Sequence, residues 1–204
     1  YPPRDCNQGF DLTFAGRIVK MFSKISNFWK EGFEMALKII LECLIFIALS
    51  CGAVFWSIRP AAGGVLGRMH VYPPEIVTRC RELGIVPENG KGPEYNRQRV
   101  VFILVSIPLQ SCLCFFLGGA RDFLSAFLQS YLMWVTELWF EVFILGCGWF
   151  CHASRWVIPG TEDLRDVYKD YWPHIKGGIL GMSMRTVLAA PVGFLVNLMA
   201  DLIA

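Results

Sequence analysis

Apolar residues gather in four long runs along this 204-residue chain, separated by more polar stretches. The hydrocarbon core of a bilayer is about 30 Å thick, so a helix rising about 1.5 Å per residue needs roughly twenty apolar residues to cross it. Four runs reach that length: Leu37–Ile58, Val100–Gly119, Phe123–Cys151 and Ile175–Ala204. The pattern predicts an all-α fold, a four-span transmembrane helix bundle that forms one domain over residues 37–204.

Residues 1–36 form an N-terminal tail and interfacial segment in this interpretation. The first methionine is Met21, so residues 1–20 are interpreted as a fragment edge or as upstream sequence that is not native. The next stretch, MFSKISNFWKEGFEM, mixes aromatic and basic residues, which is typical of a helix in the membrane interface.

The first loop contains a short helix signal, YPPEIVTRCRELGIVP. Pro73 and Pro74 suit a first helical turn, and Glu75 opposes the positive end of the helix dipole. Gly84 suits the position after the last turn. These residues predict a short capped helix that lies on the bundle.

The third loop carries a second helix signal. Pro159 and Gly160 predict a turn, and Thr161 is a good N-cap residue. One side of the following stretch is apolar at helical spacing, through Leu164, Val167, Tyr168, Tyr171 and Trp172. Pro173 ends the pattern, which predicts an amphipathic helix on a membrane surface or in a groove of the bundle.

Composition supports a membrane location. The chain is 54% apolar and only 18% charged, and its mean hydropathy is +0.45, far more apolar than a soluble domain of this size requires. The expected partners are the lipid bilayer and other membrane subunits or further copies of the chain. A net charge of +2 gives no reason to expect nucleic acid, and no cofactor is expected.

The eight cysteines lie mostly within apolar runs, where a thiol behaves as a small hydrophobic group. No disulfide framework can be derived from their spacing. Cys147 and Cys151, at i and i+4, share a helix face, and with the adjacent His152 they resemble a metal cluster. A fourth ligand is missing, so no metal site is expected.

Basic residues near the ends of the spans predict the orientation. Loop two holds only Arg121, whereas loops one and three together hold eleven basic residues. These eleven are Arg59, Arg68, Arg79, Arg81, Lys91, Arg97, Arg99, Arg155, Arg165, Lys169 and Lys176. The count predicts a multi-pass protein of the cell membrane with loops one and three in the cytoplasm and both termini outside. Lys24, Lys30 and Lys38, which precede or begin the first span, weigh against an N-terminus outside the cell.

Ionisable residues inside spans are costly, and by default they mark functional positions. Counted from the span ends, Gln110, Glu141 and Arg185 lie at one depth; Glu137 lies one turn from Glu141, and Glu42 lies further out. These five residues form the predicted polar seam. Glu141 and Arg185 are expected to pair, either to fix the packing of spans three and four or as part of a proton or cation path. Gly177 and Gly181 have the spacing of a close helix contact.

A second group of polar residues lies in loop three. His152 follows span three and His174 precedes span four, so both are expected at the cytoplasmic surface. If the chain is an enzyme, the candidate catalytic residues are His152, Arg155, Glu162 and His174. The alternative is that the histidines cap helix ends or bind loop carbonyls.

The motifs WFCH, RW.IPGTED and Y..Y..HI.GG in Trp149–Lys176 resemble an uncharacterised family of small four-span bacterial integral membrane proteins. That resemblance implies a topology and no activity. The stretch EDLRDVYKDYWPHIK is also similar to the tail of membrane isoprenylcysteine methyltransferase-like enzymes, which closes over S-adenosylmethionine. It implies a role for Glu162, Tyr168 and Tyr171, although the upstream RHP.Y.G element is absent and Lys169 replaces a glycine of that family.

Two functions remain open. The first is a small transporter, or a subunit of a membrane assembly, that uses the polar seam. The second is a membrane-embedded, methyltransferase-like enzyme that acts at the cytoplasmic surface through the loop-three residues. Whether the chain is an enzyme is uncertain, with the balance against it.

Overall fold

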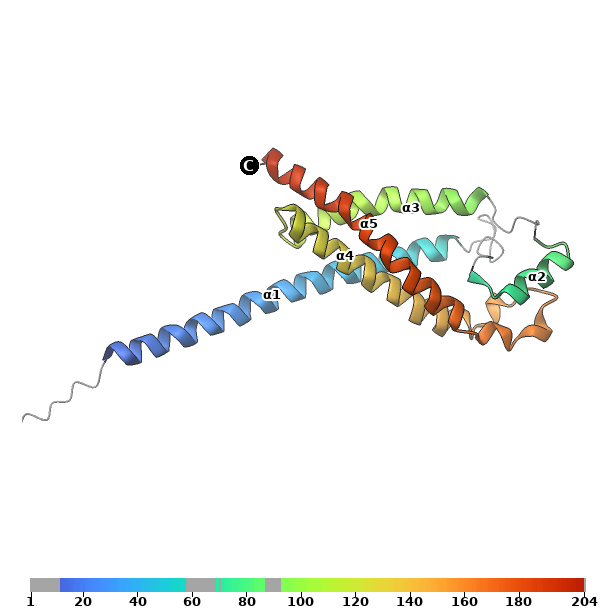
Figure 1. Ribbon diagram of the computed structural model, residues 1–204, viewed down its shortest axis with the longest axis horizontal. Coiled ribbons are helices and arrows are strands. Elements are labelled where there is room, and N and C mark those ends of the chain that lie inside the picture. The colour runs from blue at the N-terminus through green and yellow to red at the C-terminus, as the bar shows by residue number, and fades with distance from the viewer. Residues whose placement is uncertain (1–11, 58–68, 70, 87–92, 204) are drawn as a thin grey trace, which may run out of the picture. The chain divides into compact units, whose positions relative to one another are not determined.

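The computed structural model describes residues 12–57, 69, 71–86 and 93–203, with the backbone alone for 12–19, 57 and 93–99. All regular elements in these ranges are helical (Figure 1). Four helical stretches are long and apolar enough to cross a membrane: Lys20–Trp56, Val100–Leu117, Phe123–Phe150 and Val167–Ile203. The predicted all-α, four-span architecture is confirmed at this level. The expectations for residues 1–11, and for Arg59, Arg68 and Lys91, lie outside the described residues.

The chain divides into two compact units, residues 1–38 and residues 39–204. Helix α1, Leu12–Ser57, belongs to both, so the predicted interfacial segment and the first span form one continuous helix. In the first unit every described side chain is exposed, including Phe28, Trp29 and Phe33.

In the second unit α3 (Pro93–Cys112), α4 (Phe123–Phe140) and α5 (Trp172–Ile203) pack together (Figure 1). Two of these helices continue in the wider π-helical form: η3 (Leu113–Leu117) extends α3, and η4 (Glu141–Phe150) extends α4. Trp134 of α4 is completely buried, with its ring centroid 4.9 Å from that of Phe46 and 6.1 Å from that of Phe102. Aromatic rings from three helices therefore form the centre of the bundle core.

Loops one and three share a second core. Helix α2, Pro74–Glu82, has Pro74 and Glu75 in its first turn and is followed by Gly84 at φ +68°, as the sequence predicts. Its Ile76 and Cys80 are buried against residues of loop three, among them Trp156, Ile158 and Tyr168. The Tyr72 hydroxyl donates to the Trp156 carbonyl at 3.0 Å, and burial raises the pKa of Tyr72, which keeps this donor protonated. The two loops therefore lie on one side of the bundle.

The prediction of an amphipathic helix in loop three is wrong. The segment consists of separate 3₁₀ turns at Glu162–Leu164 and Val167–Lys169, and Asp170 is extended. Thr161 does not cap a helix. Its buried hydroxyl donates to the Ile158 carbonyl at 2.7 Å and bonds the Tyr168 hydroxyl at 2.7 Å.

The reason for the difference lies in Tyr168, whose side chain is buried and whose hydroxyl also accepts the Ile158 amide at 3.1 Å. These tertiary bonds tie Tyr168 and Thr161 to Ile158, and they hold the segment as a compact loop. Pro173 does not end a helix either. It stands in the first turn of α5, where the missing N–H is harmless.

Tyr168→Phe should lower the free energy of unfolding by about 1–3 kcal/mol, because it leaves the buried Ile158 amide without an acceptor. Thermal unfolding in mild detergent measures the loss. Tyr171→Phe is the matched control, since Tyr171 is exposed and bonds only the exposed His152 among the described contacts. Equal stability of the two variants would contradict this account of loop three.

Candidate functional site

Small residues bring α5 close to α4 and its extension η4. A Cβ added at Gly178 would lie 2.8 Å from Val142 Cγ2, and one at Gly181 would lie 3.3 Å from Leu138 Cδ1. Nothing lies within 4 Å of a Cβ at Gly177. The close approach that the sequence predicts is present, but Gly178 rather than Gly177 forms it together with Gly181.

A buried ion pair joins the same two helices. Arg185 Nη2 lies 3.2 Å from Glu137 Oε2, and the two side chains are only 16% and 6% exposed. The guanidinium also lies 5.0 Å from the ring centroid of Trp134, within the range of a cation–π interaction. Arg185 is therefore held by a carboxylate and an aromatic face of α4.

The depth count favoured Glu141 as the partner of Arg185, whereas the structure places Glu137 there. The count assumed an α-helical rise from Cys151 inward. Because η4 is π-helical, with bonds from i to i+5, it holds more residues per turn and advances less per residue. The acid that reaches the level of Arg185 is consequently Glu137, which lies one turn earlier in the chain and further from Cys151.

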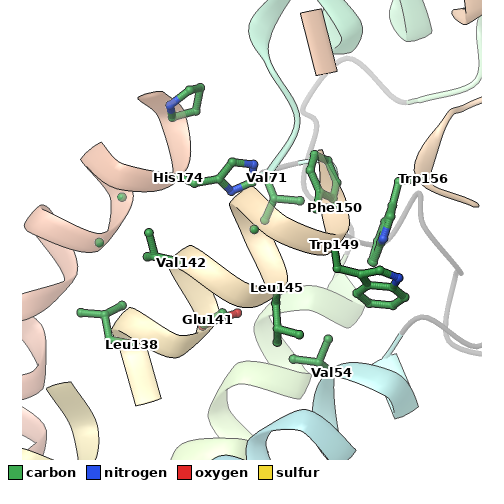
Figure 2. A pocket seen from close by; sticks show the side chains of 14 residues that line it. Val54, Val71, Leu138, Glu141, Val142, Leu145, Trp149, Phe150, Trp156 and His174 are labelled. Atoms are coloured by element: carbon green, nitrogen blue, oxygen red, sulfur yellow. The ribbon is translucent and has the colours of Figure 1, made fainter. Parts of the chain in front are cut away.

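Glu141 lines a pocket of about 260 Å³ (Figure 2). The walls come from η4, α5, α1 and the two loops, and they are mainly apolar and aromatic, including Val54, Trp149, Phe150 and Trp156. His174 is the second polar residue of the lining and packs on Phe150, with ring centroids 5.1 Å apart. Figure 2 shows His174 beside Val71 and Phe150, with Glu141 further along η4 toward Leu138. A mostly apolar pocket with few polar groups is the usual form of a ligand site.

Gly146 shapes the wall of this pocket. A Cβ at this position would lie 2.9 Å from His174 Nδ1, so glycine leaves room for the imidazole against η4. The nearest neighbour of Gly146 is thus a polar side chain.

The other two seam residues lie elsewhere in the bundle. Gln110 is buried in α3, and its Oε1 accepts from Ser130 Oγ of α4 at 2.5 Å. Glu42 of α1 is 0% exposed, and neither carboxylate oxygen has a hydrogen-bond partner. Gln129, which the sequence analysis missed, is 9% exposed and its Oε1 also lacks a partner. The signal for Gln129 was its amide within an apolar span.

The five residues of the predicted polar seam therefore do not form one continuous cluster. Glu137 and Arg185 touch, Glu141 lines the pocket one turn away, and Gln110 and Glu42 lie with their own polar neighbours on α4.

The four loop-three candidates do not converge on one site among the described residues. His152 is exposed and bonds the Tyr171 hydroxyl at 3.0 Å, and Arg155 is exposed. Glu162 Oε2 accepts the Gly160 amide at 2.9 Å and so supports the turn at Gly160, whose φ is +91°. Only His174 lines the pocket. Within the described chain, no three His, Cys, Asp or Glu side chains gather in a way that could hold a metal ion.

Comparison with protein-family models, curated proteins and solved structures finds no match. The fold and the site therefore define the class from physical features alone: an all-α helix bundle whose four long apolar helices suit a multi-pass membrane protein.

Arg185→Leu or Glu137→Leu should each destabilise the protein by about 3–5 kcal/mol, because either change leaves a buried charge without its partner. The double variant should recover much of that loss, since it leaves only a packing defect. Thermal unfolding in detergent measures the cycle. Running the same cycle with Glu141→Leu is the control, and a larger coupling there would show that Glu141 is the partner of Arg185.

Proposed function

We propose that this chain is a small transporter of the cell membrane, acting alone or as a subunit of a membrane assembly, in which the polar seam carries a proton or a small cation. The observation that supports this most directly is the buried Arg185–Glu137 ion pair with a second carboxylate, Glu141, one turn away in a pocket. Charged groups within spans commonly mark ion or proton pathways.

Two carboxylates near one guanidinium suit proton transfer. When a proton neutralises Glu137, the guanidinium loses its counter-charge and is drawn toward Glu141. When the proton leaves, the original pair re-forms. Arg185 would then move between two positions.

The pocket supplies the approach to these acids. It lies where η4 and α5 meet the core shared by loops one and three, and His174 supplies an imidazole there. We place this end of the bundle in the cytoplasm, because loops one and three hold eleven of the twelve basic residues counted near the span ends.

Exposed apolar side chains support the bilayer as partner. Large hydrophobic residues such as Leu104, Phe116, Leu128 and Phe194 are exposed on the spans, where lipid, another subunit or a second copy would cover them.

The orientation predicts opposite labelling at two exposed loop positions. In a variant without native cysteines, Asp122→Cys of loop two should react with a membrane-impermeant maleimide in intact cells, and Lys169→Cys of loop three should react only after permeabilisation. Both side chains are exposed, so access differs only by the side of the membrane. The reverse pattern would place the pocket outside.

Glu141→Gln and Glu137→Gln should slow flux by roughly tenfold or more, because each removes a carboxylate from the path. Purified protein in liposomes with an internal pH-sensitive dye, under a proton, Na⁺ or K⁺ gradient, gives the measurement. Glu162→Gln is the matched control, since it makes the same chemical change at an exposed loop residue and should leave flux unchanged. Flux no faster than in empty liposomes under all three gradients would refute the transport proposal.

A further inference from the structure

Gly118 follows η3 at the point where α1 and α4 approach one another. A Cβ built on Gly118 would come closer than 3.0 Å, nearer than real Cβ contacts, to both Glu42 Oε1 and Gln129 Oε1. Two oxygens from different helices therefore face one small volume, which is open because residue 118 has no side chain.

Both oxygens are buried acceptors. Glu42 is 0% exposed and Gln129 is 9% exposed, and neither oxygen has a hydrogen-bond partner. An ionised carboxylate in such a place is expensive, and two acceptors that face each other repel unless a positive centre lies between them. A proton or a metal cation between the two oxygens would remove this repulsion.

The described neighbours of Glu42 supply no positively charged side chain. The titratable groups in electrostatic contact with Glu42 are the thiols of Cys43, on the same helix, and Cys114, on η3. From α4 the neighbouring group is the Gln129 amide, and the backbone N–H of Gly118 also interacts with the Glu42 carboxyl group. From α5 the same core receives Val192 and Val196. No described lysine or arginine pairs with Glu42.

A metal cation would need several more oxygen ligands than these two. The nearby carbonyls each accept a hydrogen bond already: Leu113 O from the Gly118 amide at 3.0 Å, and Cys114 O from the Ala120 amide at 2.9 Å. Phe115 O accepts the Arg121 guanidinium, which also lies 3.9 Å from the Phe115 ring centroid. The two-oxygen site therefore fits a proton.

We propose that Glu42 and Gln129 form a proton-binding site in which Glu42 is a neutral carboxylic acid that donates its O–H to Gln129 Oε1. Binding adds one proton to the Glu42 carboxylate, and release breaks the same O–H bond and leaves the carboxylate. Gln129 is a positioning residue that accepts this hydrogen bond. The role of the site in transport rests on the proposed function, whereas the site itself does not.

Infrared spectroscopy of the whole protein in liposomes tests the site without measuring transport. At neutral pH the wild type should show the C=O band of a protonated carboxyl group, and Glu42→Gln should lose it. Gln129→Leu should keep the band but shift it toward the position of a free carboxylic acid, because the hydrogen-bond acceptor is gone. Glu162→Gln, which removes an exposed acid, should leave the band unchanged.

A spectrum without this band, or a band that Glu42→Gln leaves intact, would overturn the proposal. Loss of the band on adding Na⁺, K⁺ or Ca²⁺ at constant pH would show that the site holds a metal cation instead. If Glu42→Gln does not fold, Glu42→Asp and Gln129→Leu carry the test through displacement of the band. Loss of the band in Glu42→Gln together with unchanged proton flux in liposomes would keep the site and remove it from the transport path.

Discussion

The ion pair between Arg185 and Glu137 fixes how α5 lies on α4, because a charge left alone in an apolar interior costs several kcal/mol. Burial of both partners is possible only if the helices come close, and Gly178 and Gly181 supply that closeness on the same stretch of α5. The small residues and the ion pair therefore depend on each other. Replacing either glycine with a large residue would separate the charges as well as the backbones.

Hydropathy alone predicted the four spans, since the bilayer imposes a length that ordinary loops do not reach. Helix α2 was also predicted, because Pro74, Glu75 and Gly84 are local signals that act within a few residues. Loop three was not. Its form depends on the burial of Tyr168 against residues of loop one. A contact between residues so far apart in the sequence produces no periodic pattern that could predict it.

The candidate site was predicted in part for a similar reason. The sequence identified Glu137, Glu141, Arg185, Gln110 and Glu42 as costly groups inside spans, and each lies on a membrane-capable helix of the bundle. It chose Glu141 over Glu137 for Arg185 because a π-helical stretch cannot be recognised from apolar periodicity. It missed Gln129, although this residue is an amide within an apolar span, as Gln110 is, and its oxygen faces the same volume as that of Glu42.

The polar groups along α4 also mark the levels at which neighbouring helices pack closely against it. Along α4, Ser130 bonds Gln110 and Glu137 pairs with Arg185, and the buried Trp134 stands between these two levels. Its ring is enclosed by Phe46 and Phe102, and its indole N–H has no acceptor in the structure. An indole can donate but cannot accept, so it does not relay a proton. In the proposed transport function, Trp134 therefore separates the Glu42–Gln129 site from the Glu137–Glu141 pair. Passage between them requires a movement of this side chain that lets water reach both sides.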